Sequence, residues 1–189
     1  MHPAISPAGI KERFNISYAV RFYEMDGLKF AIKKLPARTV VGLARRTRNA
    51  EAQESIPGCW QEFLTGNMVA RIPHRAAPPV MYAVYSDYEK DWTGYYSYLL
   101  GCGVSRADAV PDGMEVRRIP PQTYAVFRAK GRMPDEIVGA WANIWASELP
   151  RTYTYDFEIY DKRFTRPSAK EAEVWVAVDP AKMEQAGGS

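Results

Sequence analysis

The stretch that decides the fold of this chain is Pro150-Arg151-Thr152-Tyr153-Thr154-Tyr155-Asp156-Phe157-Glu158-Ile159-Tyr160. Five of its eleven residues are aromatic or β-branched aliphatic, a composition that favours a buried strand. Since successive side chains of a strand alternate between its two faces, Tyr155, Phe157 and Ile159 share one face. Glu158 and Tyr160 then lie together on the other face.

Glu158 is an unusual residue for the middle of such a strand. Left unpaired in apolar surroundings, its carboxylate would cost several kcal/mol or take up a proton. One interpretation is that Glu158 points to solvent or pairs with a nearby arginine. The other is that it forms the polar floor of an aromatic pocket that receives a cation. Periodicity favours neither interpretation over the other.

The composition is that of an ordinary soluble globular protein, but with many aromatic residues. Of the 189 residues, 47% are hydrophobic and 25% are charged. This length supports one sizeable core, or two small halves that share one. The chain contains 12 Tyr, 5 Trp and 7 Phe. Because Tyr and Trp offer flat apolar faces with a polar edge, they suit the wall of a ligand pocket as well as a core.

Several functional classes are disfavoured by what the sequence lacks. The two histidines and the two cysteines predict neither a metal site, nor a disulfide framework, nor a Ser-His-Asp triad, and we expect no cofactor. The net charge of +3 comes from scattered basic residues without a helix-turn-helix pattern, so we expect no direct DNA binding. No apolar run is long enough to span a membrane, and there is no signal-peptide core. The cytoplasm is therefore the expected location.

An internal repeat organises the rest of the chain. The pattern apolar-Pro-x-polar-Thr, followed by an apolar strand, occurs in Leu35–Leu43 and again in Ile119–Phe127. After each copy, apolar residues at helical spacing predict an amphipathic helix. The first helix carries Ile56, Trp60, Phe63 and Leu64, and the second carries Ile137, Val138, Trp141, Ile144, Trp145 and Leu149. Trp60 corresponds to Trp141.

Each helix is followed by two aromatic strands, at 81–85 and 95–100 in the first copy and at 155–160 and 173–178 in the second. Each half therefore reads strand, helix, strand, strand, and such a half cannot close a core alone. The sequence predicts an α+β fold in which duplicated strand-helix-strand-strand modules form one antiparallel sheet with two main helices. Matching Tyr85 with Tyr160 places Ala83 at the position of Glu158, so the repeat is broken at the carboxylate.

The repeat also predicts the domain boundaries. Alternating residues on both sides of Asp26-Gly27, from Ser17 to Met25 and from Leu28 to Ile32, predict a β-hairpin at residues 17–33. This hairpin either extends the sheet of its own chain or pairs between two chains in a homodimer. The expected parts are an N-terminal extension with this hairpin (1–34), a main domain (35–179) with halves at about 35–103 and 119–179 and an exposed linker between them, and a flexible tail (180–189).

Six motifs carry a resemblance to a known family. They read Val40-Val41-Gly42-Leu43 with Arg46-Thr47, Ile56-Pro57-Gly58-Cys59-Trp60-Gln61-Glu62-Phe63, Tyr82-Ala83-Val84-Tyr85-Ser86-Asp87-Tyr88-Glu89-Lys90-Asp91 with Gly94-Tyr95-Tyr96, Ile119-Pro120 with Tyr124-Ala125-Val126-Phe127, Trp141 with Leu149-Pro150-Arg151, and Asp156-Phe157-Glu158-Ile159-Tyr160. In this order, and together with the duplication, they resemble the GyrI-like, or AraC effector-binding, small-molecule-binding domain. The resemblance covers residues 35–179, and the first 34 residues do not resemble a DNA-binding half.

The resemblance implies a fold similar to the drug-sensing halves of multidrug-responsive transcription regulators. In those regulators a strand glutamate at the position of Glu158 meets lipophilic cations among aromatic rings. The implied function is that of a stand-alone, multidrug-type binding protein for small lipophilic, cationic, aromatic ligands. Two alternatives stay open. One is a hydrolase that opens strained cyclopropane rings of DNA-alkylating compounds with the same glutamate, and the other is an interaction protein whose partner is DNA gyrase or a transcription regulator.

The candidate ligand-binding residues are Glu158, Trp60, Tyr85, Tyr160, Tyr82, Tyr96 and Trp141. Tyr85 and Tyr160 share the predicted face of Glu158 and suit pocket walls. The resemblance implies that Trp60 borders the pocket, because the family's first-helix Trp often does so. Core packing also explains Trp141, and sheet packing explains Tyr82 and Tyr96 equally well. In a hydrolase, Glu158 would act as the general base and Tyr85 or Tyr160 would donate to the oxyanion.

Overall fold

The computed structural model describes residues 11–14 and 21–187, which form ten strands and four helices. The strands are β1 (Lys11–Phe14), β2 (Arg21–Met25), β3 (Leu28–Leu35), β4 (Arg38–Thr47), β5 (Met81–Ser86), β6 (Tyr96–Val104), β7 (Glu115–Ile119), β8 (Gln122–Gly131), β9 (Tyr155–Tyr160) and β10 (Lys170–Ala177). The helices are α1 (Ala52–Thr65), α2 (Met68–Arg71), α3 (Asp135–Ala146) and α4 (Pro180–Gly187). None of these four helices is long and apolar enough to cross a membrane.

All described strands belong to one antiparallel sheet, in the order β1-β2-β3-β8-β10-β9-β5-β6-β4-β7. Within it, the order β8-β10-β9 of the second half mirrors the order β4-β6-β5 of the first half. Each half contributes one strand, one main helix and two further strands, and the halves meet where β9 pairs with β5. The predicted α+β fold of two duplicated modules is therefore confirmed.

The strand register shows how the two halves are related. Directly opposed residues form a row across the six central strands, in the order Phe127, Val174, Glu158, Ala83, Leu100 and Leu43. The sequence repeat matches Phe127 with Leu43 and Glu158 with Ala83, so equivalent positions lie at equal distances from the centre of the row. An approximate two-fold axis therefore passes through the pair formed by Ala83 and Glu158.

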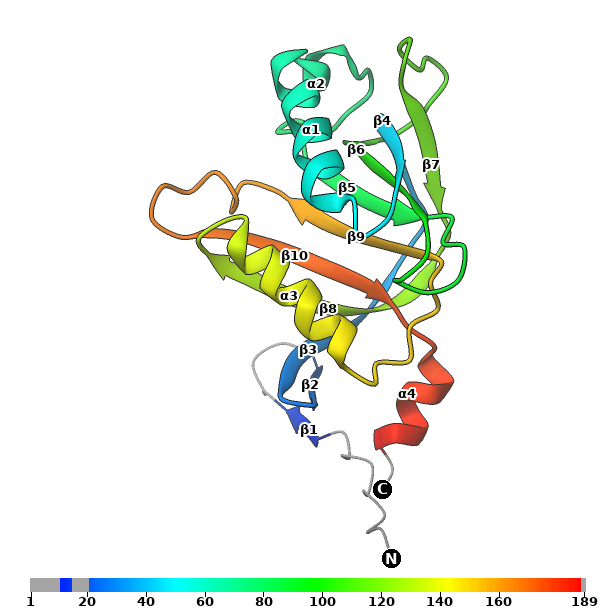
Figure 1. The fold of residues 1–189 in the computed structure, drawn as a ribbon, viewed down its shortest axis with the longest axis vertical. Coiled ribbons are helices and arrows are strands. Elements are labelled where there is room, and N and C mark those ends of the chain that lie inside the picture. Colours follow the sequence, from blue (N-terminus) through cyan, green and yellow to red (C-terminus); the bar gives the residue numbers. More distant parts are fainter. Residues whose placement is uncertain (1–10, 15–20, 188–189) are drawn as a thin grey trace, which may run out of the picture.

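The two main helices cover the same face of the sheet (Figure 1). Helix α1 packs on β4 and β6, and helix α3 packs on β8 and β10. The footprints of the helices therefore lie on the outer strands of the two modules. Between them, the central strands β5 and β9 carry the floor of a groove, and Glu158 lies on this floor.

The apolar stripes of the helices lie as predicted except at two residues. Phe63 of α1 and Ile144 of α3 are buried. Leu64 is 59% exposed and Val138 is 61% exposed, so their placement in the buried stripes is wrong. Leu64 follows Phe63 directly and is rotated by about 100° around the helix axis. Val138 faces the open cavity between the two helices.

A second apolar cluster lies on the opposite face of the sheet. The rings of Tyr124, Phe157 and Trp175 pack there with centroid distances of 5.0 to 5.7 Å. Phe157 is thus directed away from the helices, whereas Tyr160 belongs to the cluster under the helices. The alternation predicted for residues 155–160 is confirmed.

The described part of the N-terminal extension forms a hairpin on the second module. Strands β2 and β3 pair around Asp26 and Gly27, which have φ angles of 52° and 78°, and such paired positive values are typical of tight hairpin turns. Strand β3 pairs with β8, so it extends the sheet within its own chain. Residues 17–20, where the sequence also predicts strand, lie outside the described residues.

Two segments differ from their expected form. The linker between the halves is exposed only in part, because Glu115–Ile119 form β7 and pair with β4 at the edge of the sheet. Residues 180–187 form helix α4 rather than a flexible tail. The Oδ1 atom of Asp179 accepts hydrogen bonds from the backbone amides of Ala181 (3.0 Å) and Lys182 (3.4 Å), and buried Met183 packs on the core. An N-terminal cap and an apolar anchor together explain this helix.

The hairpin should contribute strongly to stability through Phe30. Phe30 is 2% exposed and its ring lies 5.3 Å from that of Phe127, so Phe30→Ala should lower the free energy of unfolding by about 3–5 kcal/mol. Phe22 of the same hairpin is 41% exposed, and Phe22→Ala should cost well under half of that. Urea unfolding measures both variants. Equal losses would contradict the role assigned to Phe30.

Candidate functional site

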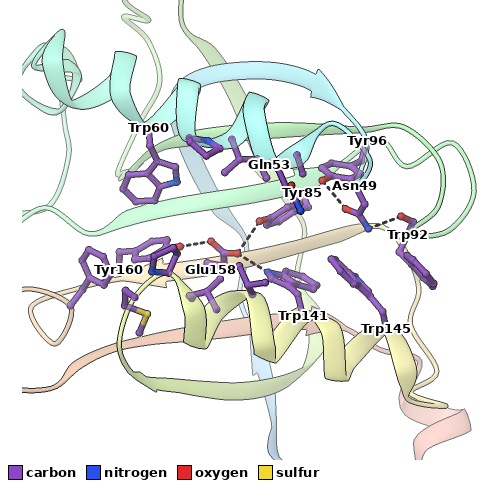
Figure 2. Close-up of a pocket in the computed structure, with 18 of the residues that line it drawn as sticks. Asn49, Gln53, Trp60, Tyr85, Trp92, Tyr96, Trp141, Trp145, Glu158 and Tyr160 are labelled. Carbon is purple, nitrogen blue, oxygen red and sulfur yellow. Dashed lines mark hydrogen bonds between the residues drawn. The ribbon is translucent and has the colours of Figure 1, made fainter.

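A cavity of about 560 Å³ lies between α1 and α3, above β5 and β9. This volume falls within the range of pockets that bind drug-sized molecules, roughly 300–1,000 Å³. Nine of the 21 residues that line it are aromatic: Trp60, Tyr85, Tyr88, Trp92, Tyr96, Trp141, Trp145, Tyr160 and Phe164. The fold places these rings together because both main helices, the strands β5, β6 and β9, and the loops that follow β5 and β9 direct side chains into the same groove (Figure 2).

Glu158 lies at the floor of the cavity and is 2% exposed. Its Oε1 accepts hydrogen bonds from the Tyr85 hydroxyl (2.8 Å) and from Nε1 of Trp141 (2.7 Å), and its Oε2 accepts one from the Tyr160 hydroxyl (2.5 Å; Figure 2). All three donors are neutral. Among the described residues, no cation pairs with this carboxylate. The interpretation that Glu158 points to solvent or pairs with an arginine is therefore wrong.

The surroundings of Glu158 set its protonation. Burial raises the pKa of the Glu158 carboxyl above its ordinary value, while the hydrogen bonds from Tyr160, Trp141 and Tyr85 act in the opposite direction. Burial and the neighbouring carboxylate raise the pKa of Tyr85 and of Tyr160 well above the usual range, so both phenols stay protonated and keep donating. A carboxylate has about four lone-pair positions, of which three are used here. One position remains on Oε2 for a further donor or for a cation.

A second acid on the same strand shows the opposite arrangement. Asp156 is fully buried and accepts hydrogen bonds from Arg151 (2.7 Å), the Tyr88 hydroxyl (2.8 Å) and the Ala177 amide (2.8 Å). The Arg151 side chain is only 3% exposed, so the pair is a closed ion pair. Its charge is compensated inside the protein, whereas the charge of Glu158 is not.

The aromatic rings around Glu158 pack in two matching pairs. The ring of Tyr85 lies 5.0 Å from that of Trp141, and the ring of Tyr160 lies 5.0 Å from that of Trp60. In each pair, the strand tyrosine of one module packs against the helix tryptophan of the other module. These contacts hold both hydroxyl groups toward Glu158.

The loop between β5 and β6 adds a further ring at one end of the cavity. Trp92 of this loop stacks on Trp145 (5.5 Å between centroids, 11° between planes), and Trp145 stacks on Trp141 (6.2 Å, 25°). Asn49 fixes the loop by donating from Nδ2 to the Trp92 carbonyl (2.9 Å), and it accepts from the Tyr96 hydroxyl (2.9 Å).

The structure brings together six of the seven candidate residues, which all line the cavity: Glu158, Trp60, Tyr85, Tyr160, Tyr96 and Trp141. Tyr82 does not, and its placement in the pocket is wrong. Tyr82 is three positions from Tyr85 and therefore points to the opposite face, where its ring lies 5.9 Å from that of Phe157.

Several lining residues were not among the candidates, notably Trp92, Trp145, Tyr88, Asn49 and Arg151. Trp145 could have been predicted, because it lies four positions after Trp141 and so on the same helix face. Trp92 lies in a polar loop without periodicity, and no sequence signal places its ring.

Comparison with known proteins gives consistent matches. Residues 31–178 match the family described as "Cass2: Integron-associated effector binding protein". The chain is similar to YobU of Bacillus subtilis (strain 168), named as a candidate transcriptional regulator protein, with 29% identity over 153 residues that cover 78% of this chain and 96% of YobU.

Two solved structures share the fold. One is the integron cassette protein VCH_CASS2 from the mobile metagenome of Vibrio cholerae, with a TM-score of 0.63 and 24% identity over 86% of this chain and all of that one. The other is SAV2435 bound to tetraphenylphosphonium, with a TM-score of 0.69 and 18% identity over 84% of this chain and 98% of that one.

The protonation of Glu158 should appear in the pH dependence of stability. Because its pKa is raised in the folded protein from the ordinary value of 4.5, the unfolded chain loses the proton first as the pH rises. The stability of the wild type relative to Glu158→Gln should therefore fall from pH 4.5 upward and level off above the raised pKa. Urea unfolding of both proteins over a pH series measures this difference, and parallel profiles would contradict the raised pKa.

Proposed function

Since the chain belongs to the family of Cass2 integron-associated effector-binding proteins, we propose that its cavity binds small lipophilic molecules that carry a positive charge. The observation that carries this proposal is the Glu158 carboxylate, which is buried among aromatic rings and has no cationic partner among the described residues. A buried carboxylate in such surroundings favours a cation, which would compensate its charge. The tetraphenylphosphonium bound by SAV2435, which has the same fold, supports this ligand class.

The affinity would come mainly from the aromatic wall. Removing the apolar surface of a ligand from water contributes about 25 cal/mol per Å². A cation over the face of a Trp or Tyr ring adds roughly 0.5–2 kcal/mol. Because flat rings accept many shapes, the wall sets a broad preference for aromatic molecules. Glu158 then selects by charge, since an anion would be repelled by a carboxylate that water screens poorly.

A hydrolase would use the same groups in another way. Glu158 would accept a proton from water through its remaining lone pair, and Tyr85 or Tyr160 would turn its hydroxyl away from Glu158 to donate to the developing oxyanion. The raised pKa of Glu158 is the observation that favours this second candidate. Mass spectrometry after incubation with a cyclopropane-containing alkylating compound distinguishes the two functions, because a binding protein returns the compound unchanged.

Replacement of Glu158 should show whether the cavity selects ligands by their charge or by their shape. Tetraphenylphosphonium and tetraphenylborate have almost the same size but opposite charge. A buried charge-assisted contact is worth about 1.5–3 kcal/mol, so Glu158→Gln should weaken tetraphenylphosphonium binding roughly 10- to 150-fold. Binding of tetraphenylborate should be unchanged or stronger, because the repelling charge is gone. Isothermal titration calorimetry measures both ligands.

The matched control is Glu54→Gln, which removes an exposed carboxylate of α1 that does not line the cavity. It should leave both affinities within about twofold, since exposed charges are well screened. An equal change for both ligands in Glu158→Gln, or no change for either, would show that Glu158 does not select the ligand by charge.

A further inference from the structure

We propose, on the basis of the function proposed above, that the preferred ligands are two-armed cations, with one aromatic group on each side of a central positive charge. This ligand class follows from the symmetry of the cavity. The approximate two-fold axis passes through the pair Ala83–Glu158, so the carboxylate lies at the centre of the site and not at one end. A ligand's positive charge that contacts Glu158 therefore has a wall of the cavity on each side of it.

Two clusters of rings flank the carboxylate (Figure 2). On one side, the ring of Tyr160 lies 5.0 Å from Trp60 and 4.8 Å from Phe164. On the other side, the ring of Trp141 lies 5.0 Å from Tyr85 and 6.2 Å from Trp145, which stacks on Trp92. We name these the Trp60 cluster and the Trp141 cluster.

The duplication explains why the clusters match. Each contains the strand tyrosine of one module and the helix tryptophan of the other. Each is completed by a ring from the loop between the last two strands of a module: Phe164 for the Trp60 cluster and Trp92 for the Trp141 cluster. Apart from Trp145, whose equivalent in the first module is the exposed Leu64, the two walls are therefore equivalent in origin and lie at equivalent places around the axis.

The carboxylate, by contrast, occurs once, because Glu158 is the one acidic residue among the described residues that line the cavity. Ala83 occupies the position equivalent to Glu158 and offers only a methyl group. The site therefore presents one carboxylate between two aromatic walls. A cationic side chain lies at each wall: Lys170 lies over the Phe164 ring (5.2 Å), and Arg151, which Asp156 neutralises, lies over the Trp141 ring (5.7 Å). A cation with a single aromatic group covers one wall and leaves the other in contact with water, whereas a cation with two such groups covers both.

A matched pair of dyes tests this inference. Pseudoisocyanine has two quinoline rings that share one positive charge through a methine bridge, and N-ethylquinaldinium is one such ring with the same charge. Trp60→Leu removes a ring from the first cluster, and Trp145→Leu removes one from the second without removing a donor to Glu158. Affinities of both dyes are measured by fluorescence titration, and folding of each variant is checked by its thermal unfolding curve.

Pseudoisocyanine should lose about 10-fold or more in affinity in each of the two variants, because each removes the partner of one arm. N-ethylquinaldinium should lose affinity in only one of them. Trp60→Phe and Trp145→Phe keep an aromatic ring and should retain most of the affinity. This result would show that the leucine variants lose affinity because a ring is missing and not because the fold is disturbed. Tyr95→Leu, an aromatic residue outside the cavity, should change neither dye.

The inference is overturned if both variants change the two dyes by the same factor, or if one cluster makes no difference to pseudoisocyanine. Failure of the proposed function has a separate signature. In that case, Glu158→Gln would leave the affinity of both dyes unchanged, whatever the tryptophan variants do.

Discussion

A carboxylate buried without a counter-ion is the constraint on which the site depends. Two acidic residues, Asp156 and Glu158, lie two positions apart on β9, and they differ in how their charge is compensated. Asp156 is neutralised by Arg151 within the core, whereas Glu158 receives only neutral donors. Desolvation of an uncompensated charge is costly, and hydrogen bonds offset this only in part. A cationic ligand that compensates the charge of Glu158 would offset this cost.

The internal duplication of the chain leaves a groove at the junction of the two modules, and Glu158 lies in this groove. Helices α1 and α3 cover the outer strands of the two modules, so the junction of β5 and β9 is left open between them. The axis of the repeat passes through this junction, and the repeat is broken there by the exchange of alanine for glutamate. Glu158 contributes the carboxylate, and Ala83, its equivalent in the other module, contributes only a methyl group, which leaves room above it. Equivalent rings from both modules then enclose a single acid.

Much of this arrangement could be predicted from the sequence, because it depends on the alternation of side chains along strands and on the internal repeat. Strand alternation places Glu158 and Tyr160 together, and the repeat relates both to Ala83 and Tyr85. The same alternation excludes Tyr82 from the pocket, because Tyr82 lies three positions from Tyr85 and so on the other face of β5. The rest depends on tertiary contacts. The stacking of Trp92 on Trp145 depends on a loop held by Asn49, and helix α4 depends on the docking of one methionine, and neither leaves a periodic signal.

The proposed binding mode places a cationic centre on Glu158 between two aromatic walls. Tetraphenylarsonium tests it directly, because its arsenic atom carries the charge and scatters X-rays anomalously. In crystals grown with this cation, we expect one strong anomalous peak in the cavity next to the Glu158 carboxylate, flanked by Trp60 and Trp141. The peak should disappear or weaken strongly in Glu158→Gln. A peak elsewhere on the protein, or one of equal strength in the variant, would show that Glu158 does not hold the cation.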